Sequence, residues 1–223
     1  MHRHLKMLAG ARITRVAMVV GHLADQVEAD ISQVKYDSTP VDLIYNPEYE
    51  KGSALSLLQA EAVLKDGPAI VLDANILFPP MLLTRMLEAP TSDCLAVDEQ
   101  LVDTGEEVKV MVRPDGWVSE LAKCVTDIEH VAGESVGIYR FSAQTNQILV
   151  PALRNAVSID SGIEYETVIN GILEEIEMGC VAVGDLPWIE IDFPSDVDRA
   201  RQKVWPALAG WEDTPGAAAI QHT

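Results

Sequence analysis

Short apolar runs alternate with segments of helical spacing through the first half of the chain. Apolar residues at helical spacing over 52–68 and 79–89 predict two helices. The first has Ser53 as a plausible N-cap, and the second has proline in its first turn. Near-continuous apolar strands between such helices are typical of a parallel sheet covered on both faces. Three runs rich in β-branched and aliphatic residues predict these strands, at 13–21, 41–47 and 69–75.

The second half of the chain has a different pattern. Two extended runs joined by a Pro-Asp-Gly turn at 114–116 predict an antiparallel hairpin over 107–125. A further strand is predicted over 134–142, where Ser142 is positioned to cap the next helix. Antiparallel pairing is therefore expected to extend the parallel sheet.

The remaining chain predicts a helix, a strand and a second helix. Val168, Ile172 and Ile176 share one helical stripe, and Gly179 ends this helix as a C-cap. The segment "WIEID" predicts a strand, and Ser195 is expected to cap the helix that follows it. These elements predict a Rossmann-like, three-layer α/β fold with a mixed, mostly parallel sheet and an antiparallel hairpin. The predicted domain covers residues 1–208, and residues 209–223 form a flexible tail.

Charge and composition exclude several classes of function. Sixteen Lys and Arg against 35 Asp and Glu give a net charge of −19, which repels nucleic acid and anionic membrane. No apolar run is long enough to span a membrane, and the N-terminus lacks the apolar core of a signal peptide. Three widely spaced cysteines without zinc-ligand spacing predict a reduced, cytoplasmic protein.

Candidate chemistry gathers where predicted strands end. Asp73 and Asn75 are two residues apart and are expected to point the same way, and Asp192 ends another strand. These three side chains are candidates for one Mg²⁺ site, because Mg²⁺ prefers oxygen ligands. Lys109 and Lys123, one on each arm of the hairpin, are candidates for phosphate contact, with solvated edge lysines as the alternative. Neither GxGxxG, GxxxxGK[ST] nor GxSxG occurs.

A resemblance to a known family rests on the order of several motifs. It is carried by "HLKMLAGARITRVAMVVGHLADQV", "NPEYEKGSALSLLQAEAVL", "LDANILFPP", the hairpin, "GESVGIYRFS", "EYETVINGIL" and "WIEIDFPSDVDRA", over roughly residues 3–207. In this order the chain resembles the sugar-phosphate nucleotidyltransferase family, in particular its phosphocholine and phosphonate cytidylyltransferase-like branch. In that family an opening strand and a Gly-rich phosphate loop precede the first matched motif, so the chain is expected to lack this loop and to start upstream in the natural product.

The resemblance assigns roles to individual residues. The family has two aspartates that bind the metal. Asp192 matches one of them, and the neutral amide Asn75 stands at the position of the other. Asp73 lies two residues before Asn75. Lys109 and Lys123 match lysines near the phosphates or the acceptor. The positions near the nucleotide base are Gly52 and Ser53. The positions near the acceptor are Glu134 and Glu166. Tyr139, Tyr165 and Trp188 are candidates for an aromatic wall that would hold a quaternary ammonium group, with packing in the core as the alternative.

The implied reaction moves a nucleotidyl group from a nucleoside triphosphate, preferably CTP, to a phospho-alcohol, phosphonate or sugar phosphate, with Mg²⁺ and pyrophosphate release. Homo-oligomers are expected if the missing strand leaves sheet edges unpaired. Two alternatives stay open. One is a GT-A-type glycosyltransferase, because Asp73-Ala74-Asn75 resembles a weakened D-x-D motif. The other is a degenerate domain that binds a nucleotide or a partner without turnover.

Overall fold

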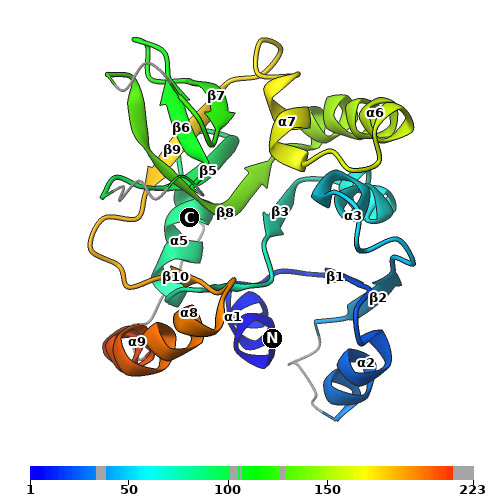
Figure 1. The fold of residues 1–223 in the computed structure, drawn as a ribbon, viewed down its shortest axis with the longest axis vertical. Helices are drawn as coiled ribbons and strands as arrows, with labels where there is room; N and C mark the ends of the chain where they lie inside the picture. The colour runs from blue at the N-terminus through cyan, green and yellow to red at the C-terminus, as the bar shows by residue number, and fades with distance from the viewer. Residues whose placement is uncertain (34–38, 101–104, 106, 126–128, 213–223) are drawn as a thin grey trace, which may run out of the picture. The chain divides into compact units, whose positions relative to one another are not determined.

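The chain forms two compact units. A computed structural model describes residues 1–33, 39–100, 105, 107–125 and 129–212 (Figure 1). The first unit comprises Met1–Ala69 and Phe141–Ile176, and the second comprises Ile70–Arg140 and Glu177–Thr223. One domain over residues 1–208 stays a prediction. The helix α9 continues to Glu212, beyond the predicted start of the tail, and residues 213–223 lie outside the described residues.

The first unit joins a pair of parallel strands to a group of packed helices. The predicted strands at 13–21 and 41–47 are confirmed as β1 and β2, which pair in parallel from Val16↔Val41 to Val20↔Tyr45. The helix α3 packs against α6 and α7. Ser142 caps α6 as predicted, because its side chain accepts the Thr145 N–H at 3.1 Å. The elements of this unit are α1 (His2–Gly10), β1 (Val16–Val20), α2 (Ala24–Ser32), β2 (Val41–Tyr45), α3 (Ser53–Gln59), α4 (Glu61–Leu64), α6 (Ala143–Ile159) and α7 (Tyr165–Asn170).

Two predicted helices of this unit end earlier than expected. The helix predicted over 52–68 is broken at Ala60 into α3 and α4, and its N-cap is Gly52, not Ser53. The helix predicted to end at Gly179 stops at Asn170, where Gly171 follows as its C-cap. The predicted apolar stripe of Val168, Ile172 and Ile176 is nevertheless buried, although the chain forms turns after Gly171.

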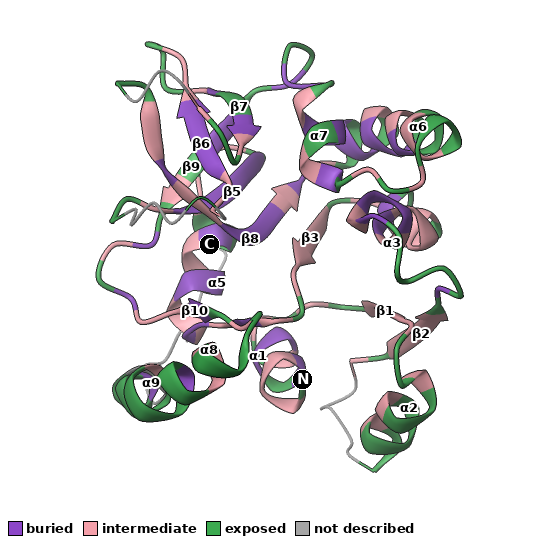
Figure 2. Cartoon of the chain, viewed as in Figure 1, coloured by how far each residue is buried: buried purple, intermediate pink, exposed green. Residues whose placement is uncertain are grey.

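The second unit contains a mixed sheet. Within the described residues this sheet has six strands, in the order β7-β6-β8-β5-β9, with β3 paired to β8. The strands β5 and β9 are parallel, whereas β8 is antiparallel to β5 and β6, and β6 is antiparallel to β7 as the hairpin predicts. Figure 2 shows that β5, β6 and β8 consist largely of buried residues. The strands are β3 (Ala69–Leu72), β5 (Asp93–Asp98), β6 (Lys109–Val112), β7 (Val118–Ala122), β8 (Val131–Phe141) and β9 (Met178–Ala182).

Helices and a short strand pair complete the second unit. The helix α5 (Pro80–Glu88) begins with proline as predicted and buries Leu82, Leu83 and Met86. Its last carbonyls accept hydrogen bonds from the guanidinium of Arg140 on β8, at 2.7 Å for Met86 and 2.8 Å for Leu87. A cation at a helix C-terminus satisfies these otherwise unpaired carbonyls. The other elements are β4 (Ile76–Leu77), β10 (Ile189–Glu190), α8 (Pro194–Arg199), η1 (Ala200–Val204) and α9 (Trp205–Glu212).

The fold class agrees with the prediction of a mixed α/β fold with an antiparallel hairpin. The strand β5 and the strand β9 were not predicted, although "DCLAV" is an apolar run of strand length. None of the helices in the described part has the length and apolar character that crossing a bilayer requires.

Candidate functional site

Asn75 lies beside two carboxylates of the second unit. The strands β4 and β10 pair antiparallel with Glu190 opposite Ile76, and the Ile191 N–H donates to the Asn75 carbonyl at 3.0 Å. This pairing places the Asn75 side chain between its neighbours. Its Nδ2 donates to Asp192 Oδ1 at 2.8 Å and to Glu190 Oε1 at 3.1 Å. The predicted proximity of Asn75 and Asp192 is thus present in the structure, and Glu190 joins them.

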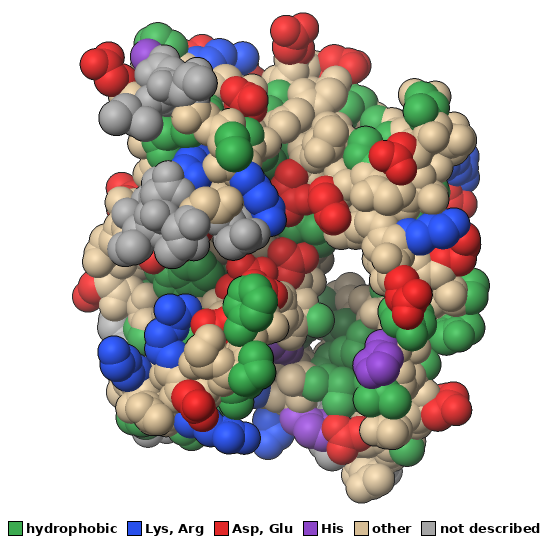
Figure 3. All heavy atoms as spheres, viewed as in Figure 1, with side chains coloured by type: hydrophobic (Ala, Val, Ile, Leu, Met, Phe, Trp, Pro, Cys, Tyr) green, Lys and Arg blue, Asp and Glu red, His purple; other side chains and the backbone are tan. Residues whose placement is uncertain are grey.

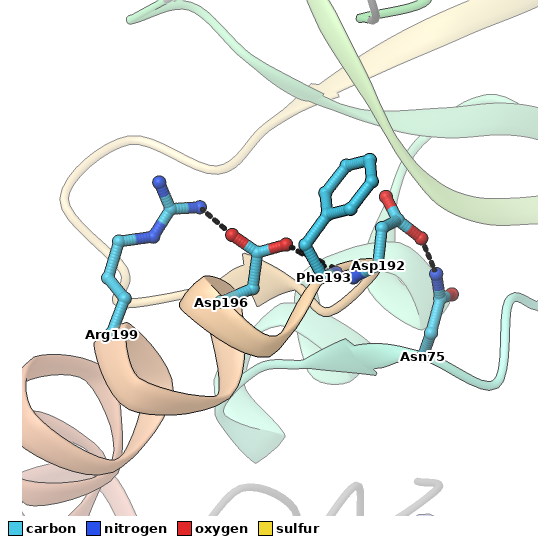
Figure 4. Close-up of polar contacts among 5 residues, drawn as sticks. All are labelled: Asn75, Asp192, Phe193, Asp196 and Arg199. Atoms are coloured by element: carbon cyan, nitrogen blue, oxygen red, sulfur yellow. Dashed lines mark hydrogen bonds and ion pairs between the residues drawn. The ribbon is translucent and has the colours of Figure 1, made fainter.

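The start of α8 fixes the backbone at Asp192. Asp196 Oδ2 accepts the Phe193 N–H at 2.9 Å and the Asp192 N–H at 3.2 Å, and Arg199 lies 3.6 Å from the other oxygen (Figure 4). The prediction that Ser195 caps this helix is wrong, because the N-cap is Phe193 and Ser195 is already the second helical residue. The Asp196 carboxylate, at the third helical position, accepts the N–H of the N-cap. Hydrogen bonds from the Phe193 backbone lower the pKa of Asp196. The carboxylate of Asp192 is consequently left to face Asn75, as Figure 4 shows.

Asp73 does not share a strand with Asn75. The strand β3 ends at Leu72, and Ala74 and Asn75 form a turn before β4, so the expected two-residue alternation is interrupted. The Asp73 N–H donates to the Gly137 carbonyl at 2.9 Å. A Cβ at Gly137, where φ is +75°, would collide with the Asp73 carboxylate. The structure therefore places the Asp73 side chain against β8, and the prediction that it points the same way as Asn75 from one strand is wrong.

Negative charge accumulates around Glu190. Burial and then the Asp192 carboxylate raise the pKa of Glu190, while the Asn75 hydrogen bond and the Lys123 ammonium lower it. A site in which burial and a neighbouring carboxylate raise the pKa of Glu190 favours a positively charged ligand.

A row of charged residues crosses the sheet next to these carboxylates. Glu134 on β8 is paired with Asp98 on β5 and with Lys109 on β6, so the three side chains share one face. Burial, followed by the charges of Asp98, Glu107 and Glu190, raises the pKa of Glu134 to about 7. Trp188 Nε1 donates to Asp98 Oδ2 at 2.6 Å, which joins the residue before β10 to this row.

The two predicted lysines have different environments. Lys109 is 4% exposed, and its Nζ donates to the Lys123 carbonyl oxygen at 2.7 Å. Lys123 directly follows β7 and is exposed. Contact of Lys123 with a phosphate stays a prediction. Lys109 instead holds the backbone at Lys123, so the structure does not support the prediction that Lys109 contacts phosphate directly.

The predicted base-binding residues belong to the first unit and contact the segment before α7. The Gly52 N–H donates to the Ser161 carbonyl at 3.1 Å, and the Ser53 N–H donates to Glu164 Oε2 at 3.0 Å. Ser53 Oγ accepts the Tyr165 N–H at 2.9 Å. Ser53 is thus the first residue of α3 rather than its cap, and its side-chain oxygen accepts from Tyr165 instead of from the helix backbone. A contact of Gly52 or Ser53 with a nucleotide base stays a prediction.

The residues predicted to lie near the acceptor differ in how far they are buried. Tyr139 is 0% exposed and bonds Ser135 through its hydroxyl at 2.9 Å, and Tyr165 is 5% exposed. Both belong to the apolar cores of their units, so the prediction that they line a substrate wall lacks support. Trp188 is half-buried. Glu166 lies in the first turn of α7, in the first unit.

The prediction that Asp73, Asn75 and Asp192 hold a Mg²⁺ ion stays a prediction. Among the residues that the structure describes, no three His, Cys, Asp or Glu side chains are grouped to hold a metal ion. Glu190 and Asp192 do reach one common atom, Asn75 Nδ2. Mg²⁺ is commonly bound in proteins by one or two carboxylates together with substrate phosphates. The two carboxylates fit this pattern.

The predicted site residues did not include Glu190, Asp98 or Asp196, although Glu190 was expected on the same strand face as Asp192. Glu190 alternates with Asp192 in "WIEID", and this spacing was available as a signal. Asp196 is the third residue of a helix that begins at Pro194. From this position a carboxylate can accept the backbone N–H of the N-cap residue, and a proline is common at the first helical position. Asp98 carried no comparable signal, because its strand was not predicted.

No family model matches the chain. Two curated relatives do. The chain is 24% identical over 201 residues to a CMP-5'-(3-aminopropyl)phosphonate synthase from Streptomyces rubellomurinus, covering 86% of the chain and 32% of that protein. It is 25% identical over 212 residues to a bifunctional IPC transferase and DIPP synthase from Rubrobacter xylanophilus. This match covers 93% of the chain and 45% of that protein. The chain therefore spans less than half the length of these relatives.

Solved structures share the fold. The inositol-1-phosphate CTP transferase from T. maritima superposes with a TM-score of 0.73 at 19% identity, covering 97% of this chain and 83% of that one. The CTP:phosphocholine cytidylyltransferase from Streptococcus pneumoniae gives a TM-score of 0.67 at 16% identity. The match covers 89% of this chain and 82% of that one. The resemblance to nucleotidyltransferases is thereby confirmed at the level of fold, and the similar proteins are named for nucleotidyl transfer to phosphorus-bearing compounds.

Proposed function

We propose that this chain transfers a nucleotidyl group, CMP from CTP, to a small phosphate- or phosphonate-bearing acceptor and releases pyrophosphate. The observation that carries the proposal is the meeting of Asn75, Glu190 and Asp192 at the β4–β10 pair. The matched motifs assign two metal positions to Asn75 and Asp192. The names of the curated relatives and of the similar structures support the reaction class.

The chemistry requires little from the protein beyond positioning and charge neutralisation. An anionic oxygen of the acceptor attacks the α-phosphorus of CTP and forms a new P–O bond. The bond from the α-phosphorus to the oxygen that bridges to the β-phosphorus breaks, and pyrophosphate leaves with that electron pair. Because the attacking oxygen is already anionic, no side chain has to remove a proton. In-line positioning and stabilisation of charge on the α-phosphate are then the main sources of catalysis.

Glu190 and Asp192 are the proposed holders of Mg²⁺. When bound with the nucleotide, this ion neutralises charge on the phosphate oxygens. Lys123 is exposed, and its ammonium lowers the pKa of nearby Glu190, so it is the lysine that we assign to phosphate contact. Lys109 supports Lys123 through the hydrogen bond to the Lys123 carbonyl.

An acceptor that carries an amino or quaternary ammonium group fits the charged row best. Asp98 and Glu134 are paired across β5 and β8, and Trp188 donates to Asp98. Carboxylates beside an indole ring attract cations by charge and by cation–π interaction. Aminoalkyl phosphonates and phosphocholine therefore rank before inositol phosphates and sugar phosphates as acceptors.

The experiment is a screen of four nucleoside triphosphates against these acceptors, with pyrophosphate release as the readout. We expect release with CTP and an amino-bearing acceptor, in the presence of Mg²⁺. Asp192→Ala should abolish release, whereas the neighbouring Ser195→Ala should retain it. Release with other triphosphates but not CTP would contradict the assignment of the base.

One observation favours a second candidate function, binding without turnover. Asn75 carries no charge, although it stands where the motif has a metal carboxylate. If the chain binds CTP in calorimetry but releases no pyrophosphate with any acceptor, this second function is supported and the first is rejected. Consumption of a nucleotide sugar without pyrophosphate release would instead support a glycosyltransferase.

A further inference from the structure

The amide of Asn75 occupies the position of a bridge between two carboxylates. One nitrogen atom, Nδ2, donates to Asp192 at 2.8 Å and to Glu190 at 3.1 Å. An amide nitrogen has two hydrogens, so both bonds are made at once. Hydrogen bonds to ionised carboxylates are stronger than those between neutral groups. The two negative groups are therefore held together by a neutral donor.

The backbone keeps this arrangement in place from both sides. The Ile191 N–H donates to the Asn75 carbonyl at 3.0 Å, which fixes β10 beside the turn that carries Asn75. Asp196 accepts the Asp192 N–H at 3.2 Å and fixes the start of α8. The side chains meet because the backbone is fixed, so a substitution at position 75 changes the bridge without first moving its partners.

We propose that Asn75 is a built-in substitute for a cation, which keeps the Glu190–Asp192 pair stable when no metal is bound. A cation that enters between the carboxylates has to displace the amide hydrogens first. An aspartate at position 75 would remove the donor and add a third negative group. The stability of that variant would then depend on a bound cation, whereas the stability of the natural chain does not. This inference deepens the proposed function, because it concerns the same site.

The test is thermal unfolding at pH 8 in EDTA and in Mg²⁺, with sodium chloride added to equalise ionic strength. We expect Asn75→Asp to lower the unfolding midpoint in EDTA by about 5 °C or more, as expected when a charge-assisted bridge is replaced by repulsion. Mg²⁺ should restore most of this loss in Asn75→Asp and change the midpoint of the natural chain by less than about 2 °C.

Two variants control for the change itself. Asn75→Asp combined with Asp192→Asn returns one amide and two carboxylates to the cluster, so at least half of the lost midpoint should return in EDTA. Asp73→Asn changes a carboxylate on the other side of the turn and should not create a Mg²⁺ response. A midpoint of Asn75→Asp in EDTA equal to that of the natural chain would overturn the inference. Equal Mg²⁺ shifts for the two proteins would also overturn it.

A measurement on the natural chain covers the case in which Asn75→Asp does not fold. The two side-chain N–H signals of Asn75, identified by their loss in Asn75→Ala, should shift downfield relative to other asparagines in nitrogen-correlated NMR spectra. Signals that lie in the ordinary range without Mg²⁺ would reject the bridge. None of these measurements uses a nucleotide, so the inference can hold even if the proposed transfer reaction is not found.

Discussion

At the scale of single residues, Glu134 combines partial burial with three neighbouring carboxylates. These raise its pKa to about 7, whereas an unfolded chain would give an ordinary value near 4.5. The folded state then binds a proton more tightly than the unfolded state between these two values. The stability is accordingly highest below pH 4.5 with respect to this group and falls as the pH rises toward 7.

Replacing Glu134 with glutamine removes this dependence. Glu134→Gln should be more stable than the natural chain at pH 8 and similar to it near pH 4.5, where both side chains are largely neutral. Urea unfolding of both proteins across this pH range measures the difference. Glu166 lies in the first unit, so Glu166→Gln serves as the control. This variant should keep the same dependence of the free energy of unfolding on pH between 4.5 and 7 as the natural chain. An unchanged slope in Glu134→Gln would contradict the raised pKa.

The two hairpin lysines give a second prediction at this scale. Lys109 is buried and donates to the Lys123 carbonyl, so Lys109→Met should cost about 1–3 kcal/mol of the free energy of unfolding. Lys123 is exposed, and Lys123→Met should stay within about 0.5 kcal/mol of the natural chain. Under the proposed function, Lys123→Met should weaken CTP binding directly. Equal stability of the two variants would show that the buried hydrogen bond contributes little.

At the scale of elements, the start of α8 offers a direct comparison of two possible caps. Asp196 accepts two backbone N–H groups, from Asp192 and Phe193, whereas Ser195 is already inside the helix. We expect Asp196→Ala to lower the unfolding midpoint by about 2–4 °C, the usual effect of a lost cap in a chain of this size. Ser195→Ala should lower it by less than about 1 °C. If Ser195→Ala lowered the midpoint more than Asp196→Ala does, the prediction that Ser195 caps α8 would be supported instead.

The comparison of α8 with the earlier helices shows what sequence patterns can and cannot establish. The existence of these helices follows from apolar spacing, which reports a buried side and survives changes of local geometry. The position of their ends depends on which of several nearby polar groups bonds the backbone. Ser53, for example, accepts the Tyr165 N–H from a segment distant in sequence. In contrast, Asn170-Gly171 marked the true end of α7 and was available from sequence.

The same limit explains the candidate site. The meeting of Asn75 and Asp192 was predictable, because strand ends carry both residues and the matched motifs pair them. The role of the Asn75 nitrogen was not, because sequence does not reveal which atom of an amide faces its neighbours. The burial of Lys109 depended on pairing with β8, and the position of Asp98 depended on a strand that was not predicted. Long-range pairing is therefore the information that the sequence pattern lacked.

At the scale of the whole molecule, the net charge of −19 acts on stability. Figure 3 shows Asp and Glu side chains spread over much of the face in view. Mutual repulsion of such charges destabilises a compact state, and salt screens it. Exposed ion pairs such as Arg15–Asp42 and Arg154–Glu61 act in the opposite sense, since salt weakens them, but each pair of this kind contributes little.

We therefore expect the unfolding midpoint to rise with ionic strength. Between about 10 mM and about 150 mM sodium chloride the Debye length shortens from about 30 Å to about 8 Å, which screens repulsion across the molecule before it affects contacts of a few ångström. Thermal unfolding at pH 8 over this range should show an increase of the same size in the natural chain and in Asp73→Asn. Repeating the titration at pH 5, closer to the isoelectric point of about 4.4 that the sequence implies, should give a smaller increase because fewer carboxylates are charged. A midpoint that falls with salt at pH 8 would mean that attractive ion pairs outweigh the net repulsion.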